Sequence, residues 1–386
     1  MKHVPMKHAP MKHAFVLIAT CALVACATPV PEAVQGTPAP AADVPGIDAV
    51  VPPVPQPVER PVAPASVTDP AIPQDQRMAA FVDYAATTYG VDPALVRSTL
   101  AQAQFKQPII DAMSRPAEKV RSWAEYRPIF LNDKRISGGV AFLEKYRGQL
   151  DQVAIETGVP AEYIVAIIGV ETSYGTITGK YRVLDALYTL AFSYPKRAPF
   201  FAGELAQLFA LGKEEGIDIT TLNGSYAGAM GWGQFMPSSY RNWGRDGDGD
   251  GKRDLLGHSD DVFASIANYF VAHGWQRGAP VVARANRAPD AADFAPEMPD
   301  PAYAMSALAA RGYSPGPGEP VVADTAGATL FNFNGVDGPE YWIGYRNFYV
   351  ITRYNHSPMY AMAVHQLAQA IRAGADADNA AGSAAR

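Results

Sequence analysis

A single glutamate, Glu171, stands at the end of an apolar run formed by residues 164–170. Burial of an ionised carboxylate is costly, so a glutamate in such surroundings is expected to have a raised pKa. A carboxyl group with a raised pKa can donate a proton near neutral pH and take one back afterwards. Taken alone, the position is more typical of a glutamate that caps a helix end or pairs with an arginine.

A second candidate for chemistry is the segment 228–239, which reads GAMGWGQFMPSS. Its glycines allow the backbone to approach a ligand closely. Gln234 offers both a donor and an acceptor, which suits the amide and hydroxyl groups of sugars. A Gly-rich turn between two helices is the simpler interpretation, but it does not explain the ordered Gln-Phe-Met-Pro-Ser-Ser run.

The segment that begins at Asp246 matches the first nine positions of an EF-hand calcium loop. Gly257 stands at position 12, where a bidentate acid belongs, so Asp260 or Asp261 would complete the site, or the site is weak. The flanking segments do not form a clear helix pair, so we expect structural Ca²⁺ rather than a calcium sensor. The alternative is a solvated acidic turn. The expected ligands are Asp246, Asp248, Asp250, the carbonyl of Lys252, and Asp254.

Three separated motifs resemble the membrane-bound lytic transglycosylase B family: Glu171, the GAMGWGQFMPSS segment, and residues 351–357, which read ITRYNHS. The resemblance extends over about residues 78–370. It implies a goose-type-lysozyme-like core with a helical domain and a small β domain around it. It also implies cleavage of peptidoglycan between N-acetylmuramic acid and N-acetylglucosamine, with products that end in 1,6-anhydro-muramic acid.

The implied reaction explains how one carboxyl group suffices. Ordinary glycosidases use two, an acid and a second group that acts as nucleophile or activates water. Here the C6 hydroxyl of muramic acid attacks C1, and an intramolecular attack has a high effective concentration. Glu171 would protonate the leaving oxygen and then accept the C6 hydroxyl proton. Glu156 and Glu162 lie nearby in the sequence, but we predict no catalytic role for either.

The resemblance also assigns a substrate groove. Tyrosines suit it because the ring stacks on a sugar while the hydroxyl is polar, although each tyrosine suits a core equally well. Arg197 would face the lactyl or peptide carboxylates. Lys196 stands where the family often has a second arginine, and it offers a point charge without the bidentate fork. The predicted groove residues are Tyr126, Lys196, Arg197, Gln234, Tyr269, Tyr354, Asn355 and Tyr360.

Two other functions are compatible with these motifs. A non-catalytic peptidoglycan-binding scaffold would retain the groove, but the intact Glu171 and Gln234 argue against it. A hydrolytic muramidase would release reducing ends, which are one water heavier than anhydro ends. The formal net charge of −6 argues against nucleic acid as a partner. No organic cofactor is expected.

Local signals predict the helices that must position these residues. Asp92-Pro93 marks a helix start, with Asp as the cap and Pro in the first turn. A 3-4-3 spacing of apolar residues over 143–153 predicts one helix that ends at Gly158. Pro160 opens the next helix, which carries Glu171. Further helices are expected within 183–215 and over 260–273 and 357–372.

Short β-branched and aromatic runs, punctuated by Gly and Pro, predict a small sheet between residues 280 and 351. The predicted fold class is therefore α+β, mostly helical, with a goose-type-lysozyme-like core and a small antiparallel β insert. The runs are 281–282, 329–333, 341–343 and 348–351.

The N-terminal quarter is predicted to contain a targeting signal and a membrane anchor. Both cysteines, Cys21 and Cys26, lie there, so no disulfide framework or cysteine zinc site is expected in the body. The lysine-bearing start and the apolar run 14–25, shorter than the ~20 residues of a membrane span, predict a signal peptide. The run ends Leu-Val-Ala-Cys and resembles a lipobox, with Cys26 as the acylated mature N-terminus. The alternative is an ordinary signal peptide with an incidental cysteine.

In Gram-negative lipoproteins that this N-terminus resembles, Ala27 implies sorting to the outer membrane, facing the periplasm. The Pro-rich stretch that follows suits an extended spacer. Expected partners are peptidoglycan strands, the outer membrane, and cell-wall synthases or divisome proteins. The predicted organisation is a signal peptide (1–25), a lipidated Pro/Ala-rich linker (26–75), a helical domain (76–137, completed by 356–372), a lysozyme-like core (138–279), a small β domain (280–355) and a disordered tail (373–386).

Overall fold

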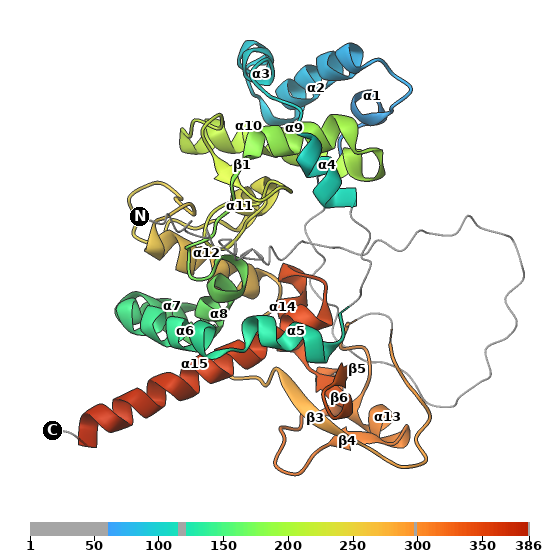
Figure 1. The fold of residues 1–386 in the computed structure, drawn as a ribbon, viewed down its shortest axis with the longest axis vertical. Helices are drawn as coiled ribbons and strands as arrows, with labels where there is room; N and C mark the ends of the chain where they lie inside the picture. Colours follow the sequence, from blue (N-terminus) through green and yellow to red (C-terminus); the bar gives the residue numbers. More distant parts are fainter. Residues whose placement is uncertain (1–60, 115–120, 297–298, 385–386) are drawn as a thin grey trace, which may run out of the picture.

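Helix α8 (Ala161–Thr172) lies at the centre of the fold and carries Glu171 in its last turn. The computed structural model describes residues 61–114, 121–296 and 299–384 (Figure 1). Every residue from 163 to 170 is buried, and a helix that is apolar all round must be covered on all sides. The helices that pack against α8 (Ala161–Thr172) are α6 (Asp133–Lys145), α7 (Arg147–Thr157), α12 (Ser259–Ala272) and α15 (Pro358–Ala384).

A second group of helices gathers at one end of the molecule, at the top of Figure 1. Its centre is α10, twelve residues of which are buried. The expected helical domain 76–137, completed by 356–372, is divided, because α2 and α4 pack on α10 and α9 whereas α5 (Trp123–Phe130) packs on α15. The group comprises α1 (Ala65–Thr68), α2 (Gln74–Tyr89), α3 (Pro93–Leu100), α4 (Gln107–Ser114), α9 (Val183–Ser193) and α10 (Ala198–Glu215).

The small sheet occupies the opposite end of the molecule (Figure 1). Its strand order is β4-β3-β6-β5, and all neighbours are antiparallel. Leu330 and Ile343 face each other across the β5–β6 hairpin and enter a separate buried cluster. The predicted strands at 281–282, 329–333 and 341–343 therefore exist. The elements are β3 (Val282–Arg287), α13 (Met305–Ala310), β4 (Tyr313–Pro315), β5 (Thr329–Gly335) and β6 (Gly338–Gly344).

The fourth predicted strand, 348–351, is wrong, because these residues belong to helix α14 (Arg346–Tyr354). All residues from 347 to 352 are buried, and a short apolar run that is covered on every side has no period that separates strand from helix. Two helix boundaries also differ from the prediction. The single helix expected over 143–153 breaks at Tyr146 (φ −112°, ψ 20°). Helix α15 continues to Ala384, through the stretch expected to be a disordered tail.

The folded body begins before the expected boundary at residue 76. The linker is predicted to extend to residue 75, yet α1 lies within residues 61–75 and both Ala63 and Val67 are buried. The backbone N–H of Ala63 donates to the carbonyl of Pro199 at 2.9 Å. The predicted signal peptide, Cys21, Cys26 and the linker up to residue 60 lie outside the described residues.

Within the described ranges, no single helix is long and apolar enough to cross a membrane. Helices α7 and α8 together would have the length and apolar composition of a membrane span, but a bend of 115° separates them. The apolar character of α8 is accounted for by its central position in the core.

Candidate active site

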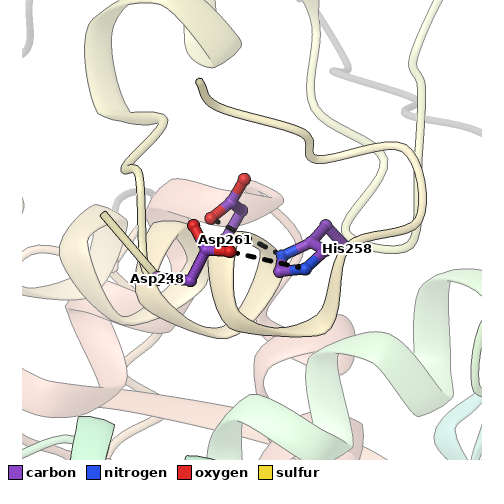
Figure 2. A group of neighbouring side chains, drawn as sticks. All are labelled: Asp248, His258 and Asp261. Atoms are coloured by element: carbon purple, nitrogen blue, oxygen red, sulfur yellow. Dashed lines mark ion pairs between the residues drawn. The ribbon is translucent and has the colours of Figure 1, made fainter. Parts of the chain in front are cut away.

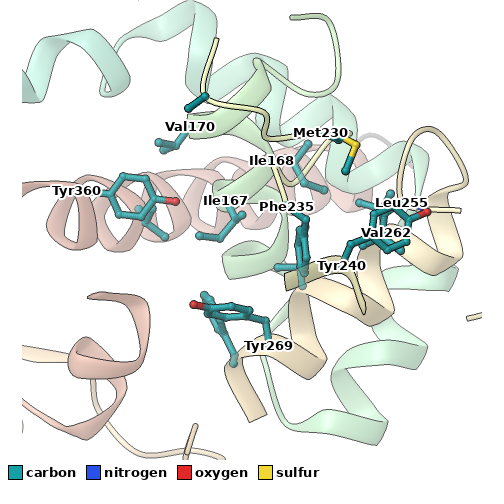
Figure 3. Packing of buried hydrophobic residues seen from close by; sticks show 14 of the residues in the cluster. Ile167, Ile168, Val170, Met230, Phe235, Tyr240, Leu255, Val262, Tyr269 and Tyr360 are labelled. Carbon is teal, nitrogen blue, oxygen red and sulfur yellow. The ribbon is translucent and has the colours of Figure 1, made fainter. Parts of the chain in front are cut away.

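The Glu171 side chain is partly exposed at the end of α8, and its carboxyl group contacts α15. Its Oε1 accepts a hydrogen bond from Tyr360 Oη at 2.6 Å, and Tyr360, on α15, is fully buried. Figure 3 shows Tyr360 in one cluster with Ile167 and Val170 of α8. Burial raises the pKa of Glu171 to about 7, while the hydrogen bond from Tyr360 stabilises the carboxylate and opposes this rise. The group can therefore give and take a proton near neutral pH.

The turn that follows Glu171 has an uncommon backbone. Ser173 and Tyr174 have φ values of 50° and 62°, and residues other than glycine hold this conformation only where their surroundings require it. Glycines on α6 and α8 leave room for the Tyr174 side chain. A Cβ at Gly139 would lie 2.6 Å from Tyr174 Oη, and one at Gly169 would lie 2.8 Å from the ring. The Tyr174 side chain thus packs against both α6 and the end of α8.

Thr172 joins the end of α8 to the Gly-rich segment. Its Oγ1 donates to the carbonyl of Trp232 at 2.9 Å and accepts from the N–H of Gly175 at 3.0 Å. The residue is 1 % exposed. Thr172 was not among the predicted site residues, although its position next to Glu171 is a signal that marks it. The hydroxyl fixes the Gly-rich segment beside the candidate acid.

The Gly-rich segment forms a tight loop around Gln234, which has φ 52°. Met230 and Phe235 close the loop by exchanging backbone hydrogen bonds of 2.9 and 3.0 Å. The Gln234 Nε2 donates to the carbonyls of Thr178 at 3.0 Å and Gly231 at 3.1 Å. Both amide hydrogens of Gln234 are therefore used to hold the loop. The expected contact of its partly exposed side chain with sugar stays a prediction.

Three of the predicted groove tyrosines lie near Glu171. Tyr354 donates from its hydroxyl to the carbonyl of Gly233 at 2.7 Å, and burial, with the nearby negative charge of Glu171, raises its pKa. Tyr269 meets Tyr354 edge to face at 4.9 Å and is 8 % exposed. Tyr360 is wholly buried, so Tyr269 and Tyr360 pack behind the site residues and do not line an open groove.

The other predicted groove residues come from separate elements. Tyr126, on α5, is partly exposed and packs beside Trp123 and Phe130. Asn355 directly follows α14 and is 9 % exposed. Lys196 and Arg197 form the 3-10 turn η1 (Pro195–Arg197) that leads into α10. The Arg197 guanidinium lies over the rings of Phe200 and Phe201, 4.6 and 5.0 Å from their centroids.

The acidic segment forms the compact loop expected of a cation site. Carboxylate oxygens of Asp246, Asp248 and Asp250 lie within 4.8 Å of one another. Asp246 accepts from the N–H groups of Gly249 at 2.7 Å and Gly251 at 2.8 Å, which bends the loop toward this carboxylate. Three hard oxygen donors converging in this way fit Ca²⁺.

The residues proposed to complete the loop in place of Gly257 have other partners. Asp260 accepts from Gln149 Nε2 at 2.7 Å. Asp261, 2 % exposed, accepts from the N–H groups of Gly247 at 2.7 Å and Asp254 at 2.6 Å. Asp261 therefore closes the loop by holding its two ends together.

His258 adds a group that the sequence did not single out. Its Nε2 lies 3.7 Å from Asp248 Oδ2, and its Nδ1 lies 3.9 Å from Asp261 Oδ1 (Figure 2). His258 and Asp261 are three residues apart at the start of α12, which is the spacing that could have revealed the pair. The imidazole links the acidic loop to α12.

Comparisons with known proteins agree with this geometry. The family model described as Transglycosylase SLT domain matches residues 73–369. Membrane-bound lytic murein transglycosylase B of Escherichia coli (strain K12) is 40 % identical over 303 residues, which cover 75 % of this chain and 81 % of that protein.

Two solved structures share the fold. The catenated lytic transglycosylase SltB1 from Pseudomonas aeruginosa is 46 % identical, with a TM-score of 0.74, over 78 % of this chain and 98 % of that chain. The Escherichia coli lytic transglycosylase Slt35 in complex with calcium is 39 % identical, with a TM-score of 0.70, over 77 % and 93 %. The mostly helical α+β fold predicted from the sequence is confirmed, and the chain belongs to the transglycosylase SLT domain family.

Proposed function

We propose that this protein is a lytic murein transglycosylase in which Glu171 is the only acid and base. The reaction cleaves the β-1,4 bond between N-acetylmuramic acid and N-acetylglucosamine and leaves 1,6-anhydro-muramic acid ends, as cell-wall turnover requires. One observation carries this proposal. The Glu171 carboxyl, with a pKa of about 7, lies where Tyr360 and the Gln234 loop meet α8.

The proton balance of the reaction needs one carboxyl group. Protonated Glu171 gives its proton to the glycosidic oxygen as the bond to C1 breaks. The C6 hydroxyl of the same muramic acid then bonds to C1, and its proton returns to the Glu171 carboxylate. The enzyme ends in its starting protonation state, and water is not consumed. The Tyr360 hydroxyl stabilises the carboxylate between the two steps.

The two nearby glutamates do not supply a second catalytic carboxyl group. Glu162 lies in the first turn of α8, nine residues before Glu171, which places it about 14 Å away along the helix. Two-carboxylate glycosidases hold their pair roughly 5–9.5 Å apart. Glu156, on α7, accepts a hydrogen bond from Gln152 on the same helix. Intramolecular attack by the sugar therefore suits Glu171 better than water-dependent hydrolysis.

Digestion of purified murein sacculi tests the function. The wild-type protein is expected to release fragments with anhydro ends, and Glu171→Gln is expected to lower the rate by about 10²–10⁴-fold. Mass spectrometry of the products separates the alternatives. Products heavier by one water would identify a hydrolytic muramidase, and binding without release would identify a scaffold. Substantial activity in Glu171→Gln would remove Glu171 from the mechanism.

Three further features complete the proposal. Asp246, Asp248, Asp250, the Lys252 carbonyl and Asp254 hold a structural Ca²⁺, supported by the converging carboxylates and by the calcium complex of the similar Slt35. Tyr126, Lys196, Arg197, Tyr354 and Asn355 contact the glycan strand or its peptides. Acylated Cys26 anchors the protein to the outer membrane, facing the periplasm, where cell-wall synthases or divisome proteins are candidate partners.

A further inference from the structure

A buried carboxylate outside the reaction site accepts two hydrogen bonds from Ser238, which follows the Gln234 loop. Glu204, on α10, is 1 % exposed. Its Oε2 accepts from the backbone N–H of Ser238 at 2.9 Å, and its Oε1 accepts from Ser238 Oγ at 2.6 Å. Ser238 is the second residue of α11 (Pro237–Trp243), where a backbone N–H has no acceptor within its own helix. Glu204 supplies that acceptor.

The position of Ser238 determines where the loop can lie. Only three residues separate it from Gln234. The loop is closed by the paired hydrogen bonds of Met230 and Phe235, and Gln234 is tied to the carbonyl of Thr178. A closed loop of this kind moves as a unit, so a shift of Ser238 is transmitted to Gln234. A misplacement of about 1 Å in a site can reduce a rate by 10²-fold.

The far end of α11 is attached to α10 through a different group. Arg241 donates to Glu214 at 2.5 Å and also to Gln207. The Glu214 side chain is 38 % exposed, whereas Glu204 is buried. The two glutamates thus join the same pair of helices at opposite ends of α11. Glu204 holds the end beside the loop, and Glu214 holds the end beside the acidic loop at Asp246.

We propose that Glu204 is a positioning residue for glycan cleavage, acting through Ser238 on the Gln234 loop. This inference rests on the proposed function, because it needs a substrate that lies against that loop. Glu204 does not touch the reacting atoms. It holds the loop at Ser238, while Thr172 and Tyr354 hold it at the carbonyls of Trp232 and Gly233.

Kinetics on soluble uncrosslinked glycan strands, followed by the release of anhydro ends, test the role of Glu204. Glu204→Gln replaces the carboxylate by a neutral amide, whose oxygen accepts from the Ser238 N–H while its NH₂ meets Ser238 Oγ. The two hydrogen bonds to a carboxylate are thereby replaced by weaker, neutral ones. We expect kcat/KM to fall by about tenfold to a hundredfold. The pH at which activity declines should stay at the wild-type value, because Glu171 and Tyr360 are untouched.

Glu214→Gln is the matched control, since it weakens the same helix pair at the exposed end. It should keep kcat/KM within about twofold of wild type at a temperature where both variants are folded. Ser238→Ala, which removes only the hydroxyl donor, serves if Glu204→Gln does not fold, and it should lower kcat/KM in the same direction. In the double variant the two losses should not add, because both changes break one contact.

The inference is overturned if Glu204→Gln or Ser238→Ala behaves like Glu214→Gln, or if the effects of Glu204→Gln and Ser238→Ala add fully. The wild-type reaction separates this failure from that of the proposed function. If the wild-type protein releases anhydro ends and the Glu204 and Glu214 variants match, only the positioning role is wrong. If the wild-type protein releases none, the proposed function itself is wrong.

Discussion

The hydrogen bond between Tyr360 and Glu171 joins residues 189 positions apart in the chain. The hydrogen bond lowers the pKa of Glu171, because the phenol stabilises the carboxylate. Burial raises the same pKa, because the apolar surroundings favour the neutral acid. The balance leaves the pKa of Glu171 at about 7. A general acid with this pKa is protonated in part of the population at neutral pH, and its conjugate base is strong enough to take the proton back.

Tyr360→Phe should therefore move the pH profile. With Glu171 as the proposed acid, activity is expected to decline as the pH rises through about 7. Removal of the phenol takes away the interaction that lowers the pKa, so the decline should shift to higher pH by roughly one unit. The measurement is kcat/KM from pH 5 to pH 9 on soluble glycan strands.

Tyr163→Phe is the matched control for this experiment. Tyr163 also lies on the α8–α15 interface, but its hydroxyl meets His365 at 2.8 Å, two turns away from Glu171. Its profile should keep the wild-type midpoint. A Tyr360→Phe profile that is unshifted, or shifted to lower pH, would contradict the role given to the phenol.

At the scale of elements, glycines decide how closely α6 and α8 approach the turn after Glu171. Gly139 of α6 has no room for a side chain, since a Cβ there would lie 2.4 Å from Ile371 and 2.6 Å from Tyr174 Oη. Gly139→Ala should reduce the free energy of unfolding by about 1–3 kcal/mol. Chemical denaturation followed by circular dichroism measures this change.

Gly148 of α7 provides the contrast for Gly139, because nothing lies within 4 Å of a Cβ there. Gly148→Ala should stabilise the protein by roughly 0.5–1 kcal/mol, the usual helix preference for alanine. Equal effects of the two substitutions would show that packing around Tyr174 is not what makes Gly139 intolerant of a side chain.

The acidic loop is the second element with a measurable consequence. Its three clustered carboxylates repel one another without a cation, so Ca²⁺ should raise the Tm by several degrees and a chelator should remove the gain. Asp250→Asn should abolish the shift. Asp337→Asn, a change of an exposed acid in the β5–β6 turn, should preserve it. A wild-type Tm that does not change when Ca²⁺ is added would refute the calcium site.

At the scale of the whole molecule, three parts follow one another along the body (Figure 1). They are the helix group of α1–α4, α9 and α10, then the central helices, then the sheet. The candidate acid lies in the central part, on α8. Residues 1–60 precede this body in the chain. A tether at Cys26 would place the catalytic body at a distance from the membrane set by the Pro-rich stretch.

Cys26→Ser should release the protein from membranes. Without the thiol there is no acceptor for the lipid, and the protein should move from the membrane pellet to the soluble fraction. Cys21→Ser is the control and should remain in the pellet. Fractionation followed by immunoblotting measures the distribution. An unchanged membrane fraction for Cys26→Ser would rule out this anchor.

Local spacing in the sequence determined the features that depend on near neighbours. Asp92 caps α3 by accepting from the N–H of Ala94 at 2.9 Å, and Gly158 ends α7 with φ 74°. The apolar run before Glu171 foretold a buried helix and a raised pKa. The order of the acids foretold the compact loop at Asp246. Each signal acts within a few residues, so it can be read without the fold.

Only the tertiary structure decided features that depend on distant partners. Residues 348–351 form a helix, and because neighbours cover them on every side, no local period distinguishes that helix from a strand. Tyr360 lies beneath Glu171 because α15 packs along α8. Glu204 reads as an ordinary helix residue until α11 brings Ser238 to it. A buried polar group takes its meaning from the partner that satisfies it, and that partner is set by packing between elements far apart in the chain.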